Sequence, residues 1–137
     1  MKGIYVLVVS VDGDTKVNVG ALGNTFFKKG LYAYVGSAQK NLKKRIDRHL
    51  RKEKRSFWHI DYLLRDVGRV VEVFWKEAEK SEECRVAKEL GKTGVPILNF
   101  GCSDCSCVSH LFMLGDLNLS MSSLAFLTAD FTRVVHA

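Results

Sequence analysis

An apolar stretch near the N-terminus decides the fold: residues 4–11 read IYVLVVSV. β-Branched and aromatic residues dominate it, which predicts a β-strand. Asp12-Gly13-Asp14 supplies a turn, and a second strand is expected around residues 16–19. A third strand is predicted where residues 30–35 read GLYAYV, with Gly36-Ser37 as its end. The chain therefore opens with a run of strands.

The remaining elements follow from helical spacing and turn residues. Leu42, Ile46 and Leu50 recur every four residues, which places them on one face of a helix. The predicted helices span residues 41–52, 58–65 and 79–90, and further strands are predicted over residues 69–75 and 110–114. This order of elements predicts an α+β domain in which helices flank a small mixed or antiparallel sheet.

Length and composition favour one globular domain. The chain has 137 residues, of which 47% are hydrophobic. We expect this domain to span residues 1–116, followed by a tail over residues 117–137 that forms a packing helix or binds a partner. The uncharged stretch between Asp116 and Asp130 has 13 residues, fewer than the roughly 20 needed to span a bilayer. Strand-like sequence directly follows Lys2, without the apolar region of a signal peptide, so a cytoplasmic location and no membrane partner are expected.

Positive charge is concentrated in one segment. Residues 40–55 hold nine basic residues and two acidic ones, whereas the whole chain has a net charge of +6. Such a patch is typical of proteins that bind a polyanion, and nucleic acid is the commonest one. A solvated helix face is the alternative. The residues expected to contact nucleic acid are Lys43, Lys44, Arg48, Arg51 and Lys52.

Two triplets carry a family resemblance. Gly3-Ile4-Tyr5 and Tyr34-Val35-Gly36, followed by Leu42, Arg45 and His49 at helical spacing, resemble the GIY-YIG nuclease superfamily. Residues 58–64 (WHIDYLL) and 101–107 (GCSDCSC) are similar to an uncharacterised, largely archaeal and bacterial branch of the domain of unknown function 123 type. The stretch between the triplets is longer than in compact members, which predicts an inserted strand pair over residues 15–27.

The resemblance implies metal-assisted phosphodiester hydrolysis. It points to Glu83 as the ligand of Mg²⁺ or Mn²⁺, with Glu79 and Glu82 as competitors; acids in a first helical turn are also favoured by the helix dipole alone. It implies that Tyr5 accepts a proton from the attacking water and that Tyr34 positions water or phosphate. Both tyrosines are otherwise ordinary strand aromatics with a polar tip.

Further roles are implied for the helix over residues 41–52. Arg45 matches the family's catalytic arginine, which holds phosphate oxygens as charge develops. His49 matches a position that protonates the leaving oxygen or holds the phosphate. Gly3 and Gly36 match the structural glycines of the triplets. The roles of His59 and Asp61 stay open between catalysis and a helix start.

The cysteines form a second signal. Cys102, Cys105, Cys107 and His110 offer four soft ligands within nine residues, and zinc binds such sets tetrahedrally. A thiol or redox role and simple burial of small side chains are the alternatives. Cys84 is expected to be a core residue of its helix.

The sequence thus favours an endonuclease that uses Mg²⁺ or Mn²⁺, with zinc as a second possible metal and nucleic acid, chiefly DNA, as its partner. A nucleic-acid-binding module without turnover is the first alternative. A metal- or redox-dependent structural protein centred on the cysteines is the second.

Overall fold

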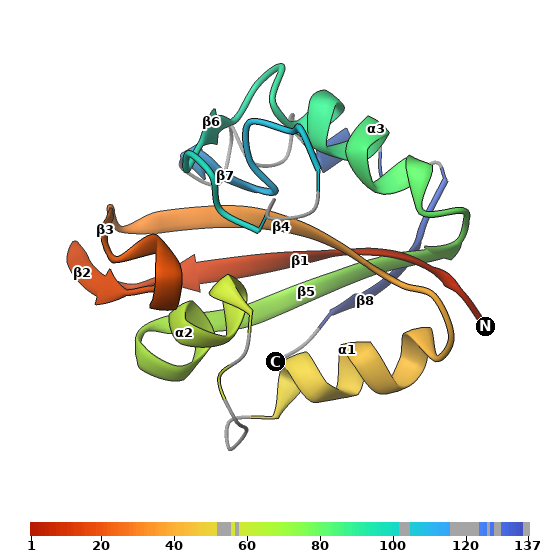
Figure 1. Ribbon diagram of the computed structural model, residues 1–137, viewed down its shortest axis with the longest axis horizontal. Helices are drawn as coiled ribbons and strands as arrows, with labels where there is room; N and C mark the ends of the chain where they lie inside the picture. The colour runs from red at the N-terminus through yellow and green to blue at the C-terminus, as the bar shows by residue number, and fades with distance from the viewer. Residues whose placement is uncertain are drawn as a thin grey trace.

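One strand is the centre of the protein. The computed structural model describes residues 1–51, 56, 58–101, 105–115, 124, 125, 127 and 130–135. β1 (Gly3–Val11) pairs along its whole length with β4 (Gly30–Ala38) on one side and β5 (Gly68–Glu77) on the other. The sheet is antiparallel throughout and has the strand order β6-β7-β4-β1-β5-β8 (Figure 1). The outer strands are β6 (Val95–Pro96), β7 (Leu111–Gly115) and β8 (Thr132–Val135).

The insertion between the two triplets is a separate hairpin. β2 (Thr15–Asn18) and β3 (Asn24–Phe27) form a two-stranded sheet at one end of the molecule, joined by the short 3₁₀ helix η1 (Gly20–Leu22) (Figure 1). This confirms the inserted strand pair predicted over residues 15–27. Val17, Val19 and Phe27 are buried, so the insertion extends the main core.

Helices cover both faces of the six-stranded sheet. α1 (Leu42–Leu50) and α2 (His59–Asp66) lie on one face, and α3 (Ser81–Leu90) lies on the other (Figure 1). Side chains alternate along a strand, so odd-numbered residues of β1 such as Tyr5 pack with the first pair of helices. Even-numbered ones such as Ile4 pack with α3. Because helices cover both faces of the sheet, the residues of the central strand are apolar on both sides and do not alternate with polar ones. The arrangement confirms the predicted α+β fold.

The structure corrects the predicted end of the third strand. Gly36-Ser37 does not break it: β4 continues to Ala38, and Gly36 is the partner of Tyr5 across the ladder. The local glycine signal is overridden because β1 provides a full-length partner for these residues.

Described residues after β7 complete the core on the α3 side of the sheet. Leu124, Leu127 and Phe131 are buried in the cluster under α3, and β8 pairs with β5 at the edge of the sheet. The sequence predicts a packing helix or a partner-binding segment here and gives no sign of this strand. Within the residues that the structure describes, no helix has the length and apolar character required to cross a membrane.

Candidate functional site

A groove forms where β4 extends beyond its neighbour β7. The ladder between these strands ends at the pair of Tyr34 and Leu111. Beyond this pair, the carbonyl of Ser37 accepts its hydrogen bond from Nη1 of Arg45, at 3.0 Å, instead of from a neighbouring strand. Side chains from both faces of the sheet therefore meet around this end of β4, because β7 does not extend between them.

The groove has a volume of about 950 Å³. It is lined by half of the predicted site residues, which come from β1, β4, α3 and α1 with its C-cap residue Arg51. The lining residues that matter for the chemistry are Tyr5, Tyr34, Gly36, Ser37, Lys40, Lys44, Arg45, Arg48, Arg51, Trp58, His59, Lys80, Glu83 and Gly101.

Tyr5 lines the groove and forms a buried pair with His49. The phenol oxygen of Tyr5 lies 2.7 Å from Nε2 of His49, and each residue is only 2% exposed. Burial raises the pKa of Tyr5 well above its usual range, and the nearby Arg45 guanidinium opposes this rise. Tyr5 is therefore a neutral phenol that can donate its proton to a neutral His49.

Tyr34 lies on the same face of the sheet, diagonally across from Tyr5. Tyr5 stands opposite Gly36 in the ladder and Tyr34 stands opposite Leu7. Burial also raises the pKa of Tyr34 well above its usual range, and Tyr5 adds to this effect. The two tyrosines thus contribute neutral hydroxyl groups to one surface.

Arg45 is held by two contacts that fix the plane of its guanidinium. Nη1 donates to the Ser37 carbonyl, and the guanidinium carbon lies 4.4 Å from the centre of the Trp58 ring. A cation over an indole face is favoured electrostatically and loses little freedom there. Arg45 is therefore oriented before any ligand arrives.

Arg48 has a different partner. Its two terminal nitrogens donate to the two carboxylate oxygens of Asp61, each at 2.9 Å, and its guanidinium carbon also lies 4.4 Å from the Trp58 ring centre. Asp61 is 0% exposed and accepts a further bond from the backbone N–H of Trp58 at the start of α2. Asp61 thus caps this helix and joins it to α1.

His59 connects the start of α2 to the chain segment at Gly101. Its Nδ1 accepts a hydrogen bond from the backbone N–H of Gly101 at 2.9 Å, and burial lowers its pKa. A neutral ring that accepts at Nδ1 carries its proton on Nε2, so that nitrogen can donate to a ligand.

Glu83 enters the groove from α3, on the opposite face of the sheet from Arg45. Oε1 accepts from the hydroxyl of Ser37 at 3.0 Å, and Oε2 lies 3.3 Å from Nδ1 of His110. Its side chain is 12% exposed. The two carboxylates that competed with Glu83 in the sequence have other partners. Glu82 pairs with Arg85 and Lys76, which lower its pKa to about 2. Glu79 pairs with Lys2.

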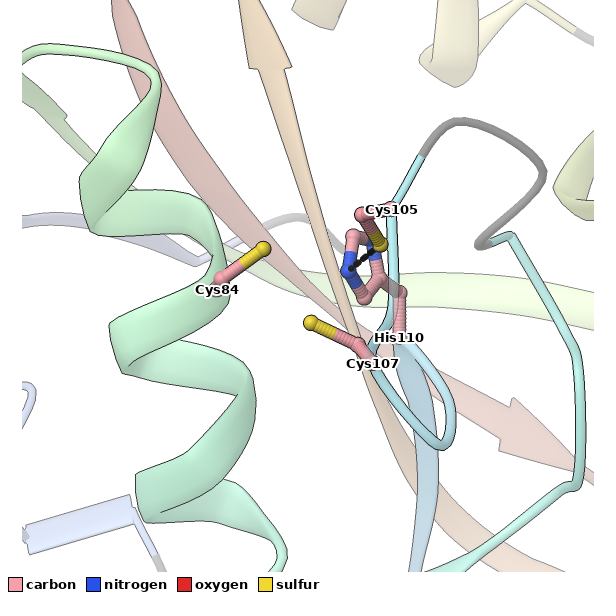
Figure 2. Close-up of side chains that lie close together, drawn as sticks. All are labelled: Cys84, Cys105, Cys107 and His110. Carbon is pink, nitrogen blue, oxygen red and sulfur yellow. Dashed lines mark hydrogen bonds between the residues drawn. The ribbon is translucent and has the colours of Figure 1, made fainter.

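A cluster of cysteines adjoins Glu83. The ligand atoms of Cys84, Cys105, Cys107 and His110 all lie within 4.8 Å of one another. Cys84 extends from α3 toward the loop that carries the other three, as Figure 2 shows. Such a set of three thiols and one imidazole could hold a metal ion, and its soft ligands suit zinc better than Mg²⁺ or Mn²⁺. Burial, followed by the neighbouring thiols, raises the pKa of Cys107 to about 12.

The structure changes one sequence prediction about the cysteines and leaves another untested. The prediction that Cys84 is an ordinary core residue is wrong, because its sulfur faces those of Cys105 and Cys107. Cys102, which the sequence grouped with them, lies outside the described residues. The spacing within the loop could not indicate a ligand from α3; the only signal was one more cysteine elsewhere in the chain.

The other predicted residues lie outside the groove or outside the described chain. Lys43 is exposed on α1, and Lys52 is not among the described residues. Gly3 packs against the carbonyl of Lys76 and the side chain of Leu42, which leaves no room for a Cβ. Sequence reasoning gave no role to Ser37 or Trp58, and it left Asp61 open.

Replacing Gly36 by alanine should disrupt the site. A Cβ at this position would lie 2.5 Å from both Cζ and the hydroxyl oxygen of Tyr5, so the buried ring must move and its bond to His49 must break. Overpacking of this kind costs about 1–3 kcal/mol. Urea unfolding measures this loss. A Cβ on Gly13 meets nothing within 4 Å, so Gly13→Ala is the control and should change stability by less than about 1 kcal/mol. Equal stability of the two variants would contradict the packing of Tyr5 against Gly36.

The comparisons with known proteins identify the family but not an activity. No curated protein and no solved structure gives a match to this chain. The sequence pattern of one family, described as "Domain of unknown function DUF123", matches residues 4–132, from β1 into β8. This match covers nearly the whole chain. The protein therefore belongs to the DUF123 family.

Proposed function

We propose that the protein is an endonuclease that hydrolyses phosphodiester bonds in DNA or RNA with a divalent cation held by Glu83. One observation carries the proposal: a single groove holds the carboxylate of Glu83, the oriented guanidinium of Arg45 and the phenol of Tyr5. These groups come from α3, α1 and β1, and each has the chemistry that one part of the reaction needs. The GIY-YIG resemblance assigns the same three residues.

The donor set around Glu83 fits Mg²⁺ or Mn²⁺. Such ions take oxygen ligands and retain water, so one carboxylate together with substrate phosphate oxygens is sufficient. Glu83 offers a partly exposed carboxylate beside the hydroxyl of Ser37. A cation bound there would act as a Lewis acid on the phosphate and favour ionisation of the attacking water.

The pair of Tyr5 and His49 supports proton removal without a buried phenolate. As the attacking water loses its proton to the Tyr5 oxygen, Tyr5 can pass its own proton to Nε2 of His49, 2.7 Å away. The charge then rests on an imidazolium instead of on the phenol, whose pKa burial has raised. This transfer needs His49 to be neutral with its proton on Nδ1.

Arg45 supports the transition state. Its guanidinium is already oriented by Ser37 and Trp58, so it can stabilise the negative charge that develops on the phosphoryl oxygens without reorganisation. Lys40, Lys44, Arg51 and Lys80 also line the groove and supply the positive potential that a polyanion requires.

Plasmid nicking tests the proposal. Supercoiled plasmid, branched DNA and structured RNA are incubated with the protein, with and without Mg²⁺ or Mn²⁺. Wild-type protein should cut at least one of them only with metal, and Arg45→Ala should reduce the rate by about 100-fold or more. Arg69→Ala is the matched control, because Arg69 is exposed and its partner is Asp12, outside the groove.

The same assay decides the second candidate function, a nucleic-acid-binding module. The basic groove supports that function independently of catalysis. Binding of the three substrates without any metal-dependent cutting would reject the nuclease and favour the module. If the protein neither binds nor cuts them, both proposals are wrong.

A further inference from the structure

The cysteine cluster joins two elements that carry parts of the groove. Cys84 follows Glu83 directly in α3, whereas Cys105, Cys107 and His110 come from the loop that leads into β7. Figure 2 shows the sulfur of Cys84 facing the sulfur of Cys107, with Cys105 and His110 beside them. The four ligands therefore converge from two separate segments, as structural zinc sites usually require.

The geometry is close to that of a tetrahedral zinc site. Sulfur atoms bound to one zinc ion lie about 3.8 Å apart, so the observed limit of 4.8 Å requires a contraction of about 1 Å. Sγ of Cys105 lies 3.4 Å from Nε2 of His110, which already matches the separation of two ligands of one ion. Small rotations of the cysteine side chains can supply the rest.

The two ring nitrogens of His110 face different groups, the cysteine cluster and Glu83. Nε2 points to the sulfur cluster, and Nδ1 lies 3.3 Å from Oε2 of Glu83. The ring is 1% exposed, so its orientation is fixed by packing. A metal-bound histidine usually donates its other N–H to a carboxylate, which orients both groups.

We propose that Cys84, Cys105, Cys107 and His110 bind one zinc ion, and that this ion holds Glu83 in the groove through His110. Zinc fixes the turn of α3 that carries Cys84 and thereby the adjacent Glu83. It also fixes the His110 ring, whose Nδ1 lies 3.3 Å from Oε2 of Glu83, so that a proton on this nitrogen faces the carboxylate. The carboxylate is then held on one side by His110 and on the other by Ser37. The zinc site stands on its own ligands; only the positioning of a catalytic carboxylate rests on the proposed function.

The first experiment measures metal content and needs no activity assay. Protein purified under reducing conditions should contain one zinc ion per chain, and replacement by Co²⁺ should give the visible absorption of tetrahedral thiolate coordination. Cys84→Ser and Cys107→Ser should lose both signals. Cys102→Ser is the matched control and should retain them. Wild-type protein without zinc or Co²⁺ absorption would overturn the site, as would loss of metal from Cys102→Ser with retention in Cys84→Ser.

The second experiment tests the link to Glu83. Zinc affinity is measured by competition with a chelator for Glu83→Gln and for Glu82→Gln, whose side chain faces Lys76 and Arg85 instead. Loss of a carboxylate behind a histidine ligand weakens metal binding by about 10- to 100-fold, so Glu83→Gln should show this loss and Glu82→Gln should not. Equal affinities would overturn the link while leaving the zinc site intact. Neither result depends on nuclease activity, so this inference and the proposed function can fail separately.

Discussion

Glu83→Gln is expected to reduce metal-dependent cleavage by about 100- to 1,000-fold, the loss typical of removing one essential electrostatic group from an active site. Glutamine has nearly the same shape as glutamate and can still accept from the Ser37 hydroxyl, but it lacks the charge that holds a divalent cation. The rate is measured in plasmid nicking over a range of Mg²⁺ concentrations, with zinc present in excess so that the cysteine cluster stays loaded.

Two controls make this result specific. Glu82→Gln and Glu79→Gln alter neighbouring carboxylates that have other partners. Glu82 pairs with Lys76 and Arg85, and Glu79 pairs with Lys2. Both should cut at nearly the wild-type rate. If Glu83→Gln retains wild-type cleavage, the cation is not held by Glu83, and a loss confined to Glu79→Gln or Glu82→Gln would move the site to that residue.

Asp61→Ala is expected to destabilise the fold by about 3–5 kcal/mol, because it leaves the partly buried guanidinium of Arg48 without its two-bond carboxylate partner. It also removes the acceptor of the Trp58 backbone N–H at the start of α2. Urea unfolding measures the loss. Asp61→Asn keeps an oxygen for the helix start and should fall between alanine and the wild type.

Asp66→Ala provides the comparison within the same helix. Asp66 pairs with Arg65 at the surface, where an ion pair adds little to stability, so this variant should unfold close to the wild type. Similar losses for Asp61→Ala and Asp66→Ala would show that the buried pair does not join α1 to α2.

Local patterns predicted the elements well. The apolar run of β1, the spacing of Leu42, Ile46 and Leu50, and the helix predicted over residues 79–90 each matched the observed element to within a few residues. Gly36 misled the prediction, because a glycine is a break signal only where no neighbouring strand holds it. The strand β8 was missed because its stability comes from pairing with β5, far away in the sequence.

The candidate catalytic residues were predicted from the family resemblance, and helical spacing placed only those that share an element. It put Arg45 and His49 on one face of their helix, and both lie where α1 faces the tyrosines. The grouping of Cys84 with the loop cysteines is a tertiary contact that spacing cannot encode. The pairing of Arg48 is also a tertiary contact. From the sequence, Arg48 was expected to contact nucleic acid, whereas in the fold its guanidinium pairs with the buried carboxylate of Asp61.

The central position of β1 gives the groove two parts of different local stability. Tyr5 is carried by a strand that pairs with β4 and β5 along its full length, so its backbone opens only when the whole sheet unfolds. Glu83 is carried by the first turn of a helix that belongs to no ladder. In native-state hydrogen exchange, the amides around Tyr5 should follow global unfolding, while those around Glu83 exchange through smaller openings. The backbone of β1 therefore forms a fixed wall of the groove, and any adjustment to a ligand is made by the helices around it.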